Sequence, residues 1–235
     1  MNLFYAPEIK EGFYQLPEEE SKHIIRVLRM KSGDSIFLTD GLGNMMEASI
    51  IDPDLKKCVV KTIKTIRNYQ KRPFHLHIAI APTKSIDRFE WFLEKSTEIG
   101  IDVITPLICS HSERTRVKPD RLQKVIIAAM KQSLKAYLPV LNEPAEFTRF
   151  IQTQFEGEKF IAYCGQQGTA ELKNNYSKEA KTLILIGPEG DFSQGEVELA
   201  KKQGFVPISL GKSRLRTETA GVVACHTVNL VNSES

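Results

Sequence analysis

Long apolar runs are missing from this sequence of 235 residues. No stretch approaches the roughly 20 consecutive apolar residues that a membrane-spanning helix needs. The amino terminus also lacks the charged and apolar regions of a secretory signal peptide. With 41% hydrophobic and 26% charged residues, the composition is that of an ordinary soluble chain. We therefore expect a cytoplasmic protein with no membrane partner.

Paired cysteines and metal-binding spacings are missing as well. The sequence has four widely spaced cysteines and no Cys-x-x-Cys: Cys58, Cys109, Cys164 and Cys225. This pattern indicates buried thiols rather than disulfides or zinc ligands. His75 and His77 alternate along a predicted strand, but no third ligand is near them in the sequence, so we interpret both as structural. We expect no metal site.

A strong charge of one sign is also absent, since the net charge is only +3. The distribution is more informative, because residues 110–135 hold seven Lys and Arg against two acids. A second basic group surrounds a predicted helix over 17–30. Both groups fit phosphate contacts, although a solvated helix face explains them equally. The RNA-contact candidates are Lys22, Arg26, Arg29, Arg114, Arg116 and Arg121.

The first 72 residues favour β-structure apart from that one helix. Ser35–Asp40 and Met45–Ile50 flank a Gly-rich turn and predict a hairpin, and a further strand is expected from Cys58 to Ile66. We expect a small β-barrel domain over 1–72. The polar, basic stretch 67–73 ends in proline and is typical of a linker.

Residues 73–235 alternate between strand and helix patterns, which predicts an α/β domain with a parallel sheet. Apolar runs predict strands at 74–81, 103–108, 160–164, 183–186 and 206–210. Apolar stripes of helical period predict helices at 85–99 and 119–135.

The stretch from 182 to 221 contains two consecutive strand, loop and helix units. Ser193 and Glu196 have capping-box spacing, and Thr217 is expected to cap the final helix. The two Gly-bearing loops are expected side by side at the carboxyl edge of the sheet, forming one ligand pocket. Neither a Walker A motif nor G-x-G-x-x-G is present, which argues against a triphosphate or dinucleotide site.

The two loops carry a resemblance to a known family. Ile-Gly-Pro-Glu-Gly-Asp-Phe-Ser at 186–193 and Leu-Gly-Lys-Ser-Arg-Leu-Arg-Thr-Glu-Thr-Ala at 210–220 resemble the signature of the ribosomal RNA small subunit methyltransferase E family of the SPOUT superfamily. The similarity extends to 23–29, 84–91, 95–100 and 128–133, and so spans nearly the whole chain.

The resemblance implies a PUA-like RNA-binding barrel over 1–72 and a SPOUT-type knotted methyltransferase domain over 73–235. It implies S-adenosylmethionine as cofactor and N3 of a uridine in the decoding region of 16S ribosomal RNA as the methylated atom. A homodimer acting on an assembled or nearly assembled small subunit is also implied. Two alternatives stay open: a non-catalytic RNA-binding protein, and a methyltransferase for another nucleotide.

The expected cofactor contacts follow the two loops and a third, looser match after the 160–164 strand. They are Tyr163, Cys164, Gly165, Ile186, Gly187, Pro188, Glu189, Gly190, Leu210, Gly211, Leu215, Arg216, Thr217, Thr219 and Ala220. The glycines allow close approach of an adenosine, because they have no Cβ. Glu189 either pairs with an amine or ribose hydroxyls or is a carboxylate on an exposed turn.

Three residues are candidates for the chemistry. Uridine N3 is a poor nucleophile until it loses its proton, so a cation is expected to stabilise the uridinate. Arg216 is the first choice and Arg214 the weaker one, although Arg216 is equally able to brace the loop through Glu189 or Glu218. Glu218 is a candidate proton acceptor, but the helix dipole alone also explains an acid in that first turn.

Overall fold

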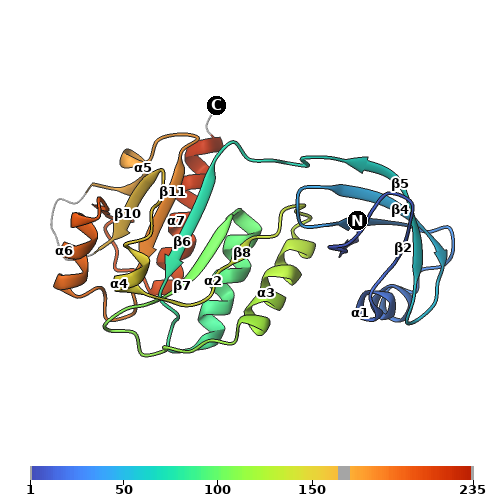
Figure 1. The fold of residues 1–235 in the computed structure, drawn as a ribbon, viewed down its shortest axis with the longest axis horizontal. Coiled ribbons are helices and arrows are strands. Elements are labelled where there is room, and N and C mark those ends of the chain that lie inside the picture. The colour runs from blue at the N-terminus through green and yellow to red at the C-terminus, as the bar shows by residue number, and fades with distance from the viewer. Residues whose placement is uncertain (1, 164–169, 234–235) are drawn as a thin grey trace. The chain divides into compact units, whose positions relative to one another are not determined.

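The computed structural model describes residues 2–163 and 170–233 (Figure 1). The chain forms two compact units, one with the residues up to Lys71 and Ile127–Leu138, the other with Arg72–Ile126 and the residues from Pro139 onward. The segment 127–138 thus returns to the first unit, a feature that the sequence pattern does not indicate.

The first unit is built on a five-stranded sheet with the order β1-β3-β4-β5-β2. The expected hairpin is confirmed, since β3 and β4 pair in antiparallel register. Asp40 fixes its turn by accepting hydrogen bonds from the backbone N–H groups of Leu42 and Asn44. The strands are β1 (Leu3–Tyr5), β2 (Phe13–Gln15), β3 (Ser35–Thr39), β4 (Met45–Asp52) and β5 (Val59–Ile66).

The expected helix over 17–30 is interrupted. Helix α1 covers Glu18–Lys22 and continues as a π-helix, η1, over His23–Val27. An α-helical period predicts one shared face for His23, Ile24, Val27 and Leu28. The π-turn shifts the positions that follow it around the helix axis, so this prediction is wrong. Ile24 is buried in the core of the unit, but Val27 is 68% exposed.

The second unit contains a parallel sheet with the order β12-β10-β11-β6-β7-β8, and β9 also pairs with β7. The α/β expectation is therefore confirmed. β11 lies between β10 and β6, which explains why its sequence is an unbroken apolar run. The strands are β6 (His75–Ile80), β7 (Val103–Ile108), β8 (Val140–Leu141), β9 (Ala145–Glu146), β10 (Glu158–Ala162), β11 (Lys181–Ile186) and β12 (Val206–Ile208).

Helices cover both faces of this sheet (Figure 1). On one face, α2 packs against α7, and α7 also contacts β6 and β11. On the other, α4 and α6 share a buried cluster with alternate residues of β6, β10 and β11. The helices are α2 (Ile86–Ile99), α3 (Pro119–Gln132), α4 (Phe147–Phe150), α5 (Leu172–Asn175), α6 (Gln194–Lys202) and α7 (Thr217–Ser233). The predicted capping box of Ser193 and Glu196 is present at the start of α6.

Burial accounts for the chemistry of several side chains that the sequence singled out. The side chains of Cys58, Cys109 and Cys225 are buried, and burial raises the pKa of the Cys58 thiol to about 11. His77 is buried beside the Thr105 hydroxyl at 2.8 Å, and burial lowers its pKa to about 4. Cys164 lies outside the described residues.

No described helix is long and apolar enough to cross a bilayer. The expected knot stays a prediction, since residues 164–169 lie outside the described part of the chain.

Gly221 allows α7 to approach α2 closely. A Cβ at this position would lie 2.7 Å from the ring of Phe92 and 2.8 Å from the Cδ1 atom of Ile80, both of which are buried. We expect Gly221→Ala to lower the free energy of unfolding by about 1–3 kcal/mol through overpacking, although alanine favours helix by about 1 kcal/mol.

Gly195 provides the matched control, because it is also helical but has open space around its Cβ position. Gly195→Ala should be neutral or slightly stabilising in urea denaturation. Equal stability of the two variants would show that the contact between α2 and α7 adjusts at no cost.

Candidate functional site

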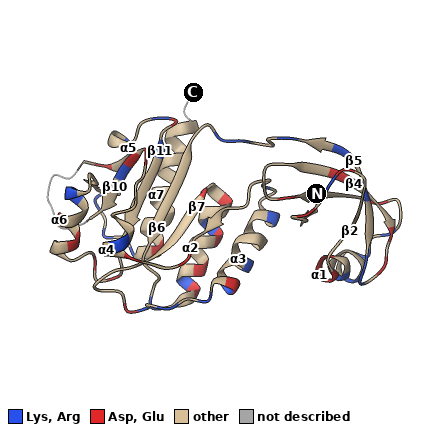
Figure 2. Ribbon diagram, in the orientation of Figure 1, with Lys and Arg blue, Asp and Glu red and all other residues tan. Residues whose placement is uncertain are grey.

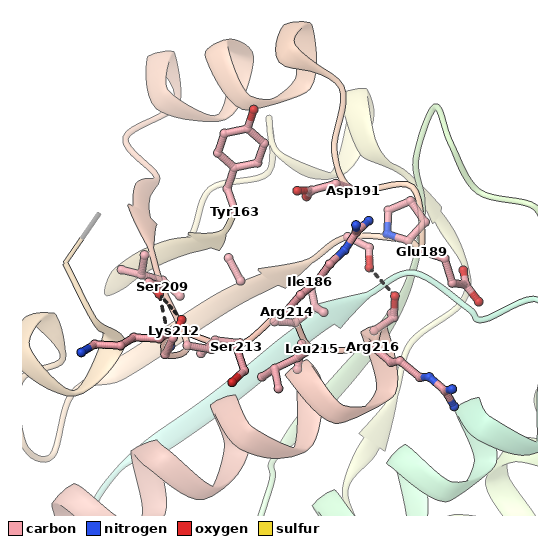
Figure 3. A pocket seen from close by; sticks show the side chains of 18 of the residues that line it. Tyr163, Ile186, Glu189, Asp191, Ser209, Lys212, Ser213, Arg214, Leu215 and Arg216 are labelled. Atoms are coloured by element: carbon pink, nitrogen blue, oxygen red, sulfur yellow. Dashed lines mark hydrogen bonds between the residues drawn. The ribbon is translucent and has the colours of Figure 1, made fainter. Parts of the chain in front are cut away.

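A pocket of about 1110 Å³ opens at the carboxyl ends of β10, β11 and β12 (Figure 3). Its walls are formed by these strand ends, the loops 187–191 and 209–216, and the first turn of α7. The expected single pocket is present. The two strands that feed its loops are not neighbours, however, because β10 lies between β11 and β12. The loops therefore meet across the end of β10.

One hydrogen bond joins the two loops. The buried Thr217 hydroxyl donates to the backbone carbonyl of Gly187 at 3.0 Å (Figure 3). Thr217 is the first residue of α7, and the carbonyl of Arg216 accepts the first helical hydrogen bond from Ala220. The expected capping role of Thr217 is therefore wrong, since its hydroxyl holds the neighbouring loop instead.

Most of the expected cofactor contacts line this pocket. They are Tyr163, Ile186, Gly187, Pro188, Glu189, Leu210, Gly211, Leu215, Arg216, Thr217 and Ala220. Gly190, Glu218 and Thr219 are not part of its lining, and Cys164 and Gly165 fall outside the described residues. Gly190 packs against the loop after β7, because a Cβ at position 190 would lie 3.1 Å from the Cβ of His111.

Sequence reasoning missed several lining residues: Ala162, Glu171, Ile208, Ser209, Lys212 and Ser213. Ala162 and Ile208 are the last residues of their strands, so the rule that ligands bind at strand ends could have predicted them. Glu171 has no such signal, because it reaches the pocket through a bridge with Ser209, 38 residues later in the chain.

The walls combine an apolar side with charged groups of both signs. Ile186, Ile208 and Leu215 supply the apolar surface. The carboxylates come from Glu171, Glu189 and Asp191, and the cations from Lys212, Arg214 and Arg216. The backbone N–H groups of residues 212–215 donate no hydrogen bond to any described residue. The pocket is thus suited to a ligand with a flat apolar part, hydrogen-bond acceptors and charges of both signs.

A residue outside the pocket lining holds the Glu189 side chain. Its Oε1 atom accepts a hydrogen bond of 2.9 Å from the backbone N–H of Lys84, in the loop after β6. Neighbouring Asp191 adopts a left-handed backbone with φ of 62°, and its carbonyl lies 3.0 Å from the Nδ1 atom of His111. The loop 187–191 is therefore held by contacts that lie outside the pocket.

The two candidate arginines point in different directions. Figure 3 shows the Arg214 side chain rising beside the loop 187–191, whereas the Arg216 side chain extends away from the pocket. Arg216 is exposed, and no described carboxylate lies within 4.0 Å of it. The alternative that Arg216 braces the loop through Glu189 or Glu218 is therefore not seen among the described residues.

Glu218 faces α2. Its side chain is buried, and its Oε1 atom lies 3.9 Å from the Nε atom of Arg88. Its Oε2 atom has no hydrogen-bond partner among the described residues. Glu218 thus lies behind the pocket wall, with one acceptor atom unused.

Comparison with known proteins finds two family models that match this chain. A family model described as RNA methyltransferase domain matches residues 70–229, and one described as RNA methyltransferase PUA domain matches residues 16–63. The chain is 31% identical to the ribosomal RNA small subunit methyltransferase E of Synechocystis sp., over 97% of this chain and 76% of that relative. The chain belongs to the ribosomal RNA small subunit methyltransferase E family.

Solved structures agree with this membership. A crystal structure of a probable rRNA-methyltransferase from Porphyromonas gingivalis superposes with a TM-score of 0.91 at 45% identity, over 98% of this chain and 99% of that one. A methyltransferase E from Neisseria gonorrhoeae, solved bound to S-adenosyl methionine, gives 0.89 at 25% identity, over 98% and 97%. The expected fold class, an α/β methyltransferase domain after a PUA-like domain, is confirmed.

In this member of the methyltransferase E family, the six RNA-contact candidates differ in how they are engaged. Lys22 pairs with Glu18 at 2.6 Å, Arg121 pairs with Asp87 and Glu90, and Arg114 donates to backbone carbonyls. Three are exposed and have no hydrogen-bond or ion-pair partner in the described part of the chain: Arg26, Arg29 and Arg116. Figure 2 shows basic and acidic residues interspersed along α2 and α3.

Thr217→Val removes the hydrogen bond that joins the two loops while keeping the side-chain volume nearly constant. We expect the free energy of unfolding to fall by about 0.5–1.5 kcal/mol, because the part-buried Gly187 carbonyl loses its donor. Amide hydrogen exchange in the loop 187–191 should accelerate.

Thr219→Val is the control, since no hydrogen bond from the half-buried Thr219 side chain is present among the described residues. It should change stability by less than about 0.5 kcal/mol. Equal effects of the two variants would show that the hydroxyl of Thr217 does not hold the loop.

Proposed function

We propose that this chain transfers a methyl group from S-adenosylmethionine to N3 of a uridine in the decoding region of 16S ribosomal RNA. The supporting observation is the single pocket made by the two loops that carry the family signature. We further propose that it works as a homodimer on an assembled or nearly assembled small subunit. The uridine, the dimer and the assembled substrate follow from the family resemblance.

The residues present fit S-adenosylmethionine. Its adenine suits the apolar surface of Ile186, Ile208 and Leu215, and its amine and sulfonium charges suit the carboxylates at positions 171, 189 and 191. The N–H groups of residues 212–215, which donate to no described residue, offer donors to adenine nitrogens and to the carboxylate of the ligand. Gly211, at φ of 121°, lets the backbone take a path that side-chain-bearing residues rarely adopt.

The cofactor supplies an electrophilic methyl group on a sulfonium whose departing thioether is neutral. The protein has to align the base with that group and favour loss of the N3 proton. We propose Arg216 for the second task. Its side chain extends away from the pocket (Figure 3), and its exposed guanidinium has no carboxylate partner among the described residues. Its planar fork can donate to a uracil oxygen or to a substrate phosphate.

Glu218 is the less direct candidate. One of its carboxylate oxygens is unused among the described residues, so it retains the capacity to accept a proton. It does not line the pocket, however, and its other oxygen faces Arg88. The proposal therefore depends on Arg216, with Glu218 as the candidate acceptor once substrate is bound.

A non-catalytic RNA-binding protein is the competing function. Isothermal titration with S-adenosylmethionine separates the two, because only the enzyme requires this ligand. Mapping base methylation in ribosomal RNA from cells with and without the gene then identifies the nucleotide. A folded protein that binds no S-adenosylmethionine would reject the enzyme, and loss of a methyl mark elsewhere would reject the uridine.

Arg216→Ala should separate binding from catalysis. We expect nearly unchanged S-adenosylmethionine affinity and a methylation rate on saturating RNA lowered by roughly 100-fold, the order found when one charge-stabilising donor is removed. Arg214→Ala should instead weaken cofactor binding, because the Arg214 side chain lies beside the loop 187–191 (Figure 3). An Arg216→Ala enzyme that turns over normally would remove Arg216 from the mechanism.

The exposed arginines of the first unit should contact phosphate. We expect Arg26→Ala and Arg29→Ala each to weaken RNA binding and to reduce the slope of log affinity against log salt by about 0.7–0.9. Lys22→Ala is the control, because Lys22 is already paired with Glu18 and should change the slope less. Identical slopes for all three variants and the wild type would show that these side chains are solvated and do not contact phosphate.

A further inference from the structure

The loop after β6 is held from two sides. From the loop after β7, the Arg114 guanidinium donates through Nε to the carbonyl of Thr83 at 3.0 Å and through Nη2 to the carbonyl of Lys84 at 2.6 Å. From the loop after β11, Glu189 accepts the backbone N–H of Lys84 at 2.9 Å. One peptide segment is thus fixed by a cation at its carbonyls and by an anion at its N–H.

The sheet order makes this arrangement possible. β6 lies between β11 and β7, so the three loops leave the same edge in the same order. Two further contacts join them, namely an ion pair of 2.8 Å between Lys84 and Glu113 and the contact of 3.0 Å between His111 and the Asp191 carbonyl. The loop after β7 is therefore connected to the loop 187–191 both directly and through Lys84.

The connection ends on the wall of the pocket. Glu189 and Asp191 line it, whereas Arg114, Glu113 and His111 do not. Arg114 is half-buried and engages three backbone hydrogen-bond contacts, so its guanidinium is already committed to the protein. Arg116, two residues later, is exposed and has no partner among the described residues.

We propose that Arg114 is a positioning residue of the cofactor pocket and not an RNA contact. By fixing the carbonyls of Thr83 and Lys84, it directs the Lys84 N–H at Glu189 and so holds the loop 187–191 in its ligand-binding shape. The proposal rests on the proposed function for the identity of the ligand. It divides the basic segment after β7 into an inward arginine that orders the pocket and an outward arginine available to phosphate.

Arg114→Ala and Arg116→Ala form a matched pair for the test. In isothermal titration with S-adenosylmethionine, we expect Arg114→Ala to raise the Kd at least about tenfold, with Arg116→Ala within twofold of the wild type. For RNA, only Arg116→Ala should reduce the salt slope. Arg114→Lys should recover part of the cofactor affinity, because one ammonium can still reach a carbonyl but lacks the second donor of the fork.

A double-mutant cycle with Glu189→Ala tests the route. If Arg114 acts through Lys84 and Glu189, Arg114→Ala should have little further effect on the Kd once Glu189 is removed. The same fold-change in both backgrounds would overturn the proposal, as would Arg114→Ala with lowered thermal stability and unchanged cofactor affinity.

Hydrogen exchange of the ligand-free protein separates this inference from the proposed function. We expect Arg114→Ala to accelerate amide exchange at residues 187–191 and Arg116→Ala to leave it unchanged. A wild type that binds no S-adenosylmethionine would reject the proposed function and leave this measurement intact. Wild-type exchange rates in Arg114→Ala would reject the positioning role.

Discussion

The parallel sheet of the second unit is the constraint on which the site depends. Every strand from β12 to β7 runs in the same direction, so the loops that follow these strands all leave the carboxyl edge of the sheet. The loops include residues 163, 187–191, 209–216, 82–85 and 109–114. Two hydrogen bonds then lock neighbouring loops together: Thr217 to the Gly187 carbonyl, and the Lys84 N–H to Glu189. The pocket is therefore built by chain segments that are far apart in sequence.

Those parts of the fold that depend on local chemistry could be predicted from the sequence. The capping box of Ser193 and Glu196 specifies the start of α6 within one turn, and the buried run at 183–186 specifies a central strand through its composition alone. The membership of the two signature loops in one pocket also followed, since strand direction fixes where loops emerge. Each of these inferences needed only neighbouring residues and one rule of sheet geometry.

The errors arose where a longer-range or less common geometry took over. A π-turn after α1 shifted the face that an α-helical period assigns to Val27. β8, β9, α4 and α5 are two to four residues long, too short for any period to show. The strand β10 separates β11 from β12, an order that depends on the whole sheet and on no motif within either strand.

The arginines show most clearly what sequence cannot supply. Arg114 and Arg116 are two residues apart in one basic segment, and charge counting treats them alike. The structure separates them, because Arg114 donates to backbone carbonyls and Arg116 has no hydrogen-bond partner among the described residues. The same holds for Arg214 and Arg216, whose side chains leave one loop in different directions (Figure 3). A local charge excess therefore marks where anionic partners approach, but the acceptors around each guanidinium decide whether it binds a partner or orders the protein.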